Sequence, residues 1–284
     1  MIPVANFLYP LFVNNTILEE AGIEKIPETR SEFVETAKAV TDPEQNIYGW
    51  VLPLNLESAN GIQNDLMSWV WACDQNMLTE DGQPDITGDG LRSVVEFVKD
   101  LYDADAISPG AFAMQEQDKV EEFTNGRVAM MVSSLAHVTQ IRENNPDLDF
   151  TIAPIPVADD FTGERGLHYA AWGLGVSANS EHKEEAWKLI EFLMSEEING
   201  ELCTYANAFP GNKNAVPQFS DEMFDIALEM YQTGHLKNEF IGLPMAEDLM
   251  RAFDEQLQLM LEGDQDIDTM LTNTQESWSS ILAE

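Results

Sequence analysis

The side chains of this sequence best suited to chemistry are aromatic rings that stand near small hydroxyl and amide groups. A pyranose has an apolar face that stacks on aromatic rings and a rim of hydroxyl groups that needs hydrogen-bond partners. Rings mixed with small polar groups therefore predict a sugar-binding site, although each ring taken singly suits a packed core equally well. The residues concerned are Asn6, Phe7, Tyr9, Ser133, Ser134, Tyr169, Trp172 and Phe209.

Patterns typical of catalysis or metal binding are missing from the sequence. The four histidines fall outside the HxH and HExxH spacings of zinc sites, and neither a GxSxG turn nor a P-loop occurs. Residues 85–96 resemble a calcium-binding loop, but Thr87 and Arg92 depart from its pattern and Pro84 excludes the incoming helix. In a chain with 51 acidic residues, pairs of acids arise by chance and do not indicate the carboxylate pair of a glycosidase. We therefore expect no catalytic residue, metal site or cofactor.

The charge of the chain excludes several classes of partner. Fourteen Lys and Arg residues stand against 51 Asp and Glu residues, which gives a net charge of −37. This charge repels phosphate backbones and anionic lipids, so we expect neither a nucleic acid nor a membrane surface as partner. Because the acids are spread along the whole chain, they favour a solvated, salt-tolerant surface. The longest apolar run, 66–73, is far shorter than the ~20 residues of a membrane helix.

Apolar periodicity predicts an α/β chain in which these residues are positioned by alternating helices and strands. The strongest helix signal covers 91–102, and Thr29 with Glu32 forms a capping box that opens another helix. In a later helix, 184–195, we expect four residues to face inward: Ala186, Trp187, Ile190 and Leu193. Further helices are predicted at 16–21, 64–73, 138–144 and throughout the part after 219, and strands at 127–132, 150–154 and 172–177.

The beginning of the sequence, MIPVANFLYPLFVNN, is apolar and aromatic from its second residue. Chain ends are normally exposed, whereas this pattern is typical of a buried strand. We therefore expect residues before Met1.

Several segments, in their order along the chain, carry a resemblance to a known family. They are FLYPLFVNNTILEEAGIEKIPETRSEFVETAKAVTD, DGQPDITGDGLRSVVEFVKDLYDADAISPGA, EFTNGRVAMMVSS, DFTIAPIP, WGLGVSANSEHKEEAWKLIEFLMSEE and AFPGNKNA. Together they resemble extracellular solute-binding proteins of carbohydrate ABC importers, of the maltose- and multiple-sugar-binding type. Asn14 matches the Asn of the family pattern, whereas Arg30 replaces its usual Trp.

The resemblance implies a two-lobed α/β fold of the periplasmic-binding-protein type (type II). It places 1–6 and 173–238 in the first lobe and 7–166 and 240–284 in the second, with hinge crossings near 5–8, 167–172 and 238–244. Family members begin with a further stretch that carries a signal peptide and the first strands of the first lobe. By the resemblance, this chain is N-terminally truncated and its first lobe is incomplete.

The same resemblance assigns ligand-binding positions at the crossings and in the second lobe. Where the family often has a Trp platform after the strand that ends at Val132, this chain has Ala136 and His137. Trp69 suits the core of a helix as well as a ligand site. The assigned positions are Asn6, Phe7, Asn64, Asp65, Trp69, Ser133, Ser134, Tyr169, Trp172, Phe209 and Arg251.

The function that the resemblance implies is that of an extracytoplasmic receptor, periplasmic or a cell-surface lipoprotein. It would be a monomer without enzymatic activity that closes about a sugar or oligosaccharide and delivers it to ABC permease subunits in the membrane. One alternative is a receptor for another solute, such as a polyamine, a glycerophosphate or a metal, but ferric iron would need converging tyrosines and no adjacent pair occurs. Another alternative is a carbohydrate-acting enzyme, for which the sequence nominates no pair of carboxylates.

Overall fold

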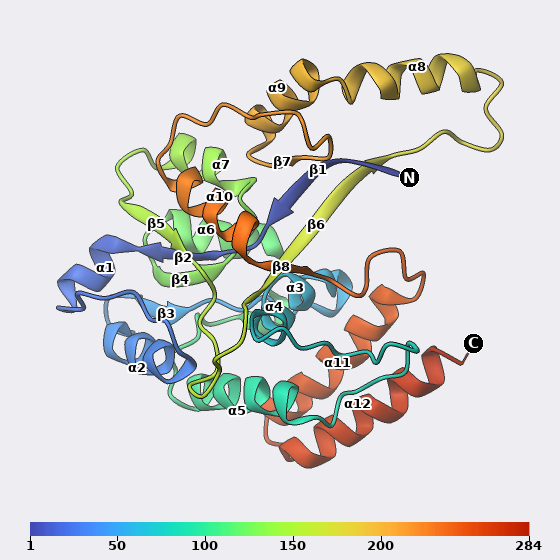
Figure 1. Ribbon diagram of the computed structural model, residues 1–284. Coiled ribbons are helices and arrows are strands. Elements are labelled where there is room, and N and C mark those ends of the chain that lie inside the picture. Colours follow the sequence, from blue (N-terminus) through green and yellow to red (C-terminus); the bar gives the residue numbers. More distant parts are fainter. Residues whose placement is uncertain (284) are drawn as a thin grey trace.

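Two four-stranded sheets organise the chain, and one strand leads directly from the first sheet into the second (Figure 1). The computed structural model describes residues 1–283. Sheet A has the strand order β7-β1-β6-β8 and sheet B the order β3-β4-β2-β5. Strand β1 (Ile2–Leu8) belongs to sheet A, and β2 (Leu11–Asn14) follows it after only two residues in sheet B. The mixed α/β architecture with two sheets confirms the predicted fold class.

Sheet A is built on the long antiparallel pair of β1 and β6 (Gly166–Leu174). The short strand β7 (Phe209–Pro210) is antiparallel to β1, and β8 (His235–Lys237) is parallel to β6. Ala5 lies opposite Trp172, while Asn6 lies opposite both Ala171 and Phe209. Because side chains alternate between the faces of a strand, Trp172 shares one face with Phe7, and Phe209 lies on the other face.

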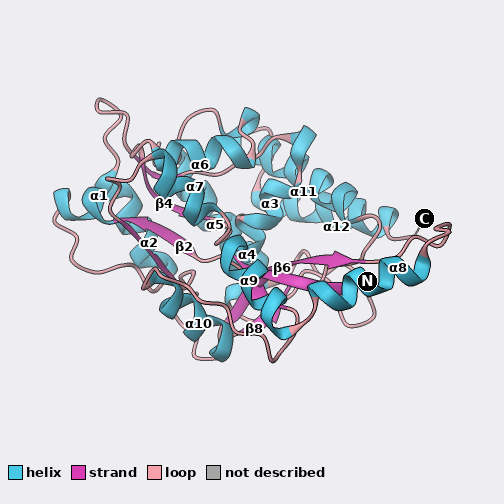
Figure 2. Cartoon of the chain, turned by 90° about the horizontal axis from the view of Figure 1, so that it is seen from above, coloured by secondary structure: helices cyan, strands magenta, loops and turns pink. Residues whose placement is uncertain are grey.

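Sheet B is buried between helices. Strands β4 (Val128–Val132) and β5 (Phe150–Ala153) are antiparallel to β2, and β3 (Tyr48–Trp50) is parallel to β4. Helices α6 and α7 lie on one side of the central strands and α2 on the other (Figure 2). The two hydrophobic cores follow this division and alternate along β2, since Phe12 belongs to the core beneath α6 and Val13 to the core beneath α2.

The helices begin and end where local signals place them. The Thr29 side chain accepts from the N–H of Glu32, and the Glu32 carboxylate accepts from the N–H of Thr29, which confirms the capping box. The helix predicted over 91–102 is also confirmed, as α5. The helices are α1 (Asn15–Glu20), α2 (Arg30–Val40), α3 (Asn60–Asn64), α4 (Leu66–Ala72), α5 (Asp89–Asp103), α6 (Glu116–Thr124), α7 (His137–Asn144), α8 (Lys183–Leu193), α9 (Glu196–Ala206), α10 (Met223–Thr233), α11 (Ala246–Leu261) and α12 (Ile267–Ile281), with short 3-10 turns at Leu56–Ser58 and Ala111–Ala113.

Three predicted elements differ from the structure. The part after 219, expected to be helical throughout, contains the short strand β8 between α10 and α11. The single helix expected over 64–73 is divided into α3 and α4, because Asp65 leaves the helical conformation at φ −119° and ψ −86°. The strand expected over 172–177 instead ends at Leu174 and begins at Gly166. A Cβ on Gly166 would meet the carbonyl oxygen of Trp71, so glycine allows β6 to start against the backbone of α4.

The inward face predicted for α8 is confirmed only in part, since Ala186 and Leu193 are half-buried and Trp187 is exposed. Of the four residues expected to face inward only Ile190 is buried, and the Trp187 side chain is 47% exposed. Phe192 and, on α9, Tyr205 are exposed as well. A hollow of about 640 Å³, lined mostly by apolar residues, lies between β1, β6 and α9. The periodic apolar residues of α8 therefore lie at the margin of the molecule (Figure 1).

Candidate functional site

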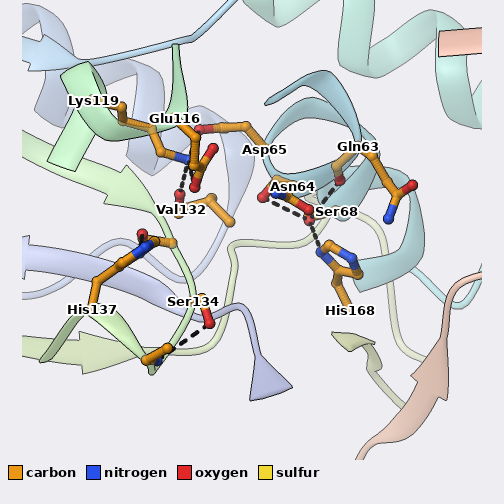
Figure 3. Close-up of polar contacts among 12 residues, drawn as sticks. Gln63, Asn64, Asp65, Ser68, Glu116, Lys119, Val132, Ser134, His137 and His168 are labelled. Atoms are coloured by element: carbon orange, nitrogen blue, oxygen red, sulfur yellow. Dashed lines mark hydrogen bonds and ion pairs between the residues drawn. The ribbon is translucent and has the colours of Figure 1, made fainter. Parts of the chain in front are cut away.

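Polar side chains gather where β1 and β6 pass beside α4, close to the link between the two sheets (Figure 3). Tyr9 and Pro10 form that link, and the Tyr9 ring stacks on His168 of β6 with centroids 4.2 Å apart. On the other side of His168 lies Trp71 of α4, with centroids 4.6 Å apart. We call this region, together with the ends of α3, α6 and β4 that meet it, the junction.

His168 joins three segments of the junction by hydrogen bonds. Its Nδ1 lies 2.7 Å from Ser68 Oγ, and its Nε2 lies 3.5 Å from the amide nitrogen of Asn238. Since the amide nitrogen is a donor, Nε2 accepts, Nδ1 donates to Ser68, and the Ser68 hydroxyl donates to the Asn64 carbonyl at 3.3 Å. Burial, aided by the charge of Lys119, lowers the pKa of His168 to about 3, so the ring is neutral.

Lys119 and Asp65 form the charged centre of the junction. Lys119 Nζ donates to the Val132 carbonyl at 2.6 Å, and it lies 3.5 Å from Asp65 Oδ2 and 3.0 Å from Glu116 Oε1. The side chains of Lys119 and Asp65 are fully buried, whereas that of Glu116 is 26% exposed. Desolvation raises the pKa of Asp65 to about 7; the charge of Lys119 opposes this rise and that of Glu116 adds to it.

Local structure explains how these charges come together. Asp65 stands at the break between α3 and α4, and Lys119 lies on the buried side of α6 beside Val120 and Phe123. The apolar stem of a lysine packs well in such a place, provided that its ammonium finds acceptors. The end of β4 supplies one, because Val132 is the last residue of the strand.

Hydroxyl groups surround this centre on the side of α7. Ser133 Oγ lies 2.8 Å from His137 Nδ1, and Ser134 Oγ accepts from the N–H of Ala136 at 3.3 Å. Burial raises the pKa of Tyr9, the charge of Glu116 adds to the rise, and a hydrogen bond with Ser134 opposes it. Burial also lowers the pKa of His137, so the junction presents neutral donors and acceptors around its charged centre.

An aromatic pair stands on the face of sheet A that carries Phe7, where Trp172 lines the apolar hollow beside α9. The rings of Phe7 and Trp172 have centroids 4.7 Å apart at an angle of 56°. Phe7 is 3% exposed, but Trp172 is 66% exposed, a large open surface for an aromatic side chain. Such an open ring supported by a buried one is suited to stacking against an apolar face of a ligand.

The structure brings some of the predicted site residues together. Asp65 contacts Lys119, Ser133 and Ser134 directly follow Val132, whose carbonyl Lys119 binds, and Phe7 meets Trp172. Asn64 is half-buried and joins the hydrogen-bond chain of His168 through its carbonyl. Tyr169 is half-buried next to His168, and its carbonyl accepts from Asn238 at 3.1 Å.

Other predicted site residues lie elsewhere. Trp69 is fully buried and packs on Phe33 and Phe97, with centroids 4.6 and 4.8 Å away, and its role in binding stays a prediction. Phe209 is 2% exposed and stacks on Tyr231 at 4.4 Å on the opposite face of sheet A from Trp172. Both rings lie in apolar surroundings, as side chains of a hydrophobic core do.

Asn6 and Arg251 are held by contacts outside the junction. The Asn6 amide donates to the carbonyl of Pro210 at 3.4 Å, on the face shared with Phe209. The Arg251 guanidinium donates to the Leu56 carbonyl at 2.7 Å and pairs with Glu247 at 2.8 Å. Their roles in binding stay predictions.

Several junction residues were not predicted from the sequence. Glu116, Lys119, Ser68 and His168 belong to no motif, and a single Lys or Glu in a helix is typical of an exposed surface. A hint was available for His168, which lies beside Tyr169 and Trp172 in the second predicted crossing.

Comparison with known proteins identifies the family. The family model described as bacterial extracellular solute-binding protein matches residues 1–226. A Brucella abortus protein described as a binding protein is 26% identical over 214 residues, which cover 75% of this chain and 50% of the relative. The chain therefore spans about half the length of the curated relatives it matches.

Solved structures share the fold. A solute-binding protein of an ABC transporter from Thermotoga lettingae, bound with α-D-tagatose, has a TM-score of 0.81 at 21% identity over 99% of this chain and 72% of its own. The maltose-bound MalE3 of T. maritima has a TM-score of 0.81 at 20% identity over 98% and 72%. Within residues 1–283, no helix combines the length and the apolar character needed to span a bilayer.

The extent of the family match decides the identity of the chain. The matched segment contains β1, β6 and most of the junction. The family is one of binding proteins and not of enzymes. The chain therefore belongs to the bacterial extracellular solute-binding protein family.

Proposed function

We propose that this chain is the substrate-binding component of an ABC importer and that it binds a sugar or oligosaccharide beside the junction. The observation that carries the proposal is the Phe7–Trp172 pair, in which an exposed ring on β6 lies four residues beyond His168 of the junction. A sugar needs this combination of a stacking surface and hydrogen-bond partners. The ligands bound in the structural neighbours, tagatose and maltose among them, support the same ligand class.

The connections between the sheets support a mechanism of hinge closure. Strand β1 runs into β2 through Tyr9 and Pro10, and β6 pairs with β1 over most of its length. Only Tyr9 and Pro10 separate β1 from β2, and rotation about this link would bring groups from both halves onto a ligand and stabilise the closed state. In this proposal the protein works outside the cytoplasm as a monomer, with membrane permease subunits as partners.

Isothermal titration calorimetry of the purified full chain tests the proposal. The panel contains monosaccharides, disaccharides and longer oligosaccharides, together with a polyamine, glycerol 3-phosphate and ferric citrate as other solutes. We expect saturable binding of at least one carbohydrate. Saturable binding of another solute, with no response to any carbohydrate, would refute the sugar assignment while leaving the family assignment intact.

The Trp172→Ala variant locates the site. We expect the variant to lose sugar affinity while Trp187→Ala, which removes another exposed tryptophan on α8, retains it. Equal affinities for the two variants would place the ligand away from the Phe7–Trp172 pair.

A further inference from the structure

A cavity with an aromatic lining lies at the carboxyl end of α5, beside the first residue of β3 and the 3-10 turn at Ala111–Ala113. Its volume is about 620 Å³, which is within the range of small-molecule sites. None of its lining residues belongs to the junction, so we name it separately as the α5 cavity. It is lined by Tyr48, Tyr102, Asp105 and Phe112, by Pro43 and Pro109, and by small or aliphatic residues of the segment 107–113.

Three aromatic side chains of the α5 cavity keep part of their surface open. Tyr102 in the last turn of α5 and Phe112 in the 3-10 turn have nearly parallel rings, with centroids 6.0 Å apart and an angle of 12° between the planes. Tyr48 of β3 is half-buried, as are these two. The face of an aromatic ring carries partial negative charge, so open rings in a cavity attract a cation that has little water to lose.

Asp105 is the one charged residue among those that line the α5 cavity in the described part of the chain. It follows the end of α5 with a left-handed φ of +53°, and its N–H donates to the Tyr102 carbonyl at 3.1 Å. The N–H of Ala106 donates to the Leu101 carbonyl at 2.9 Å, which completes a Schellman motif. Glycine is the residue favoured at the left-handed position of this motif.

A carboxylate at this position is unfavourable for a second reason. The carboxyl end of a helix is the negative end of its dipole, and the last turn of α5 contains no basic residue that would compensate it. Asp105 therefore costs stability on two counts, while its side chain is exposed and lines the cavity. Such a costly choice of residue is typical of a functional position.

We propose that the α5 cavity binds a quaternary ammonium cation, with the rings around its methyl groups and the Asp105 carboxylate as its counter-ion. A quaternary ammonium has no N–H, so it suits a lining of rings, prolines and aliphatic groups, whereas a primary ammonium has three donors to satisfy. A sugar suits this lining less, because its hydroxyl groups need several partners and Ser108, also in the lining, is only 3% exposed. The net charge of −37 attracts cations toward the chain as a whole.

The test compares matched ligands in NMR titrations of the full chain at 150 mM salt. Choline is the probe, 3,3-dimethyl-1-butanol is its uncharged isostere, and ethanolamine is the corresponding primary amine. We expect choline to bind saturably and at least roughly tenfold more tightly than either of the others. The N-methyl resonance should move upfield on binding, because protons over the face of an aromatic ring are shielded.

Variants of Asp105 separate binding from folding. Asp105→Asn keeps a side chain that tolerates the left-handed conformation and removes only the charge, so it should lose roughly tenfold in choline affinity with no loss of stability. Asp105→Gly should lose the same affinity while its midpoint of urea denaturation rises. Glu44→Gln removes an exposed charge next to Pro43 that does not line the cavity, and it should bind choline like the wild type.

A ring variant and a variant of the sugar site complete the test. Tyr102→Leu keeps an apolar side chain without a ring face, and its affinity for choline should fall toward that for the uncharged isostere. Trp172→Ala should retain choline binding, because Trp172 does not line the α5 cavity. Equal affinities of the wild type for choline and its isostere, or full choline affinity in Asp105→Asn, would refute the cation site and leave the sugar proposal untouched. Loss of choline binding in Trp172→Ala would also refute it, because the cation would then lie beside Trp172.

Discussion

Asp65 Oδ2 lies 3.5 Å from Lys119 Nζ in a place where neither side chain has any exposed surface. The pair joins the break between α3 and α4 to α6 and, through the Val132 carbonyl, to the end of β4. Removing one member of a buried pair leaves the other charge uncompensated, which costs far more than the pair itself contributes. The junction is therefore a structural element of the second sheet as well as a candidate site.

Lys119→Met tests this dependence. We expect the free energy of unfolding to fall by about 3–5 kcal/mol, because two carboxylates would lose their shared cation. Adding Asp65→Asn to this variant should restore part of the loss. Urea denaturation followed by circular dichroism measures the effect, and Lys99→Met, which breaks the exposed pair with Asp103, should cost about 0–0.5 kcal/mol. A Lys119→Met protein as stable as the wild type would contradict the analysis.

His168 predicts a loss of stability in acid. Its pKa lies at about 3 in the folded chain and at 6.5 when unperturbed, so the unfolded state binds the proton more readily. The stability that its neutral form contributes is complete above pH 6.5 and is lost as the pH falls toward 3. Denaturation at a series of pH values should show a shallower decline for His168→Gln than for the wild type between pH 6.5 and 4, by at most about 1.4 kcal/mol per pH unit.

Asp65 changes the stability of the fold with pH in the opposite direction to His168, over nearly the same pH range. Its folded pKa is raised from 3.8 to about 7, so its contribution is complete below 3.8 and declines as the pH rises through 7. Asp65→Asn should therefore remove a decline in stability as the pH rises from 3.8 to 7. His182→Gln, which changes an exposed histidine, is the control for the acid side and should keep the wild-type slope. Parallel slopes for the wild type and His168→Gln would show that the imidazole does not titrate as described.

Alanine variants of the two tryptophans assigned to the site from the sequence should differ in stability. Trp69→Ala should cost about 3–5 kcal/mol, because it opens a cavity among Phe33, Trp50 and Phe97. Trp172→Ala loses one aromatic contact and should cost no more than about 1.5 kcal/mol. Urea denaturation of both variants measures the difference, and equal losses would mean that Trp172 is buried in solution.

Thr29→Ala removes half of the capping box of α2. The expected loss is about 1 kcal/mol, because the N–H of Glu32 loses its acceptor, and Thr29→Ser should retain most of the stability. The exposed Thr272 only donates to a carbonyl one turn back in α12, so Thr272→Ala should change stability by less than about 0.5 kcal/mol. Thermal unfolding of the three variants distinguishes the cap from a general threonine effect.

The sequence predicted the elements whose signals are local. The capping box needs only Thr29 and Glu32, and α5 needs only apolar residues at helical spacing, so both were found. The break at Asp65 was missed because its charged partner, Lys119, lies far away in the sequence on another helix. Nothing near Lys119 in the sequence distinguishes it from a solvent-exposed lysine on a helix.

The candidate site was predicted in part for the same reason. The types and positions of Trp69 and Trp172 both suited a ligand, but the partners that bury the first ring come from α2, β3 and α5. Phe209 was assigned to the site because it lies close to the crossing, and the alternation of side chains in sheet A places it on the opposite face. Spacing along the chain shows which side chains lie near the crossings between the sheets. Whether such a side chain belongs to the core or to the site depends on tertiary contacts.

The exposed ring of Trp172 has an optical consequence. Four of the six indoles, those of Trp50, Trp69, Trp71 and Trp278, are fully shielded, and only Trp172 and Trp187 are open to solvent. Acrylamide, a collisional quencher, would therefore quench the fluorescence of Trp172 on β6 and Trp187 on α8. The fluorescence of the four buried tryptophans would remain. With a net charge of −37, the chain would repel iodide and attract caesium, so the two ions would quench the same pair of fluorophores with unequal efficiency.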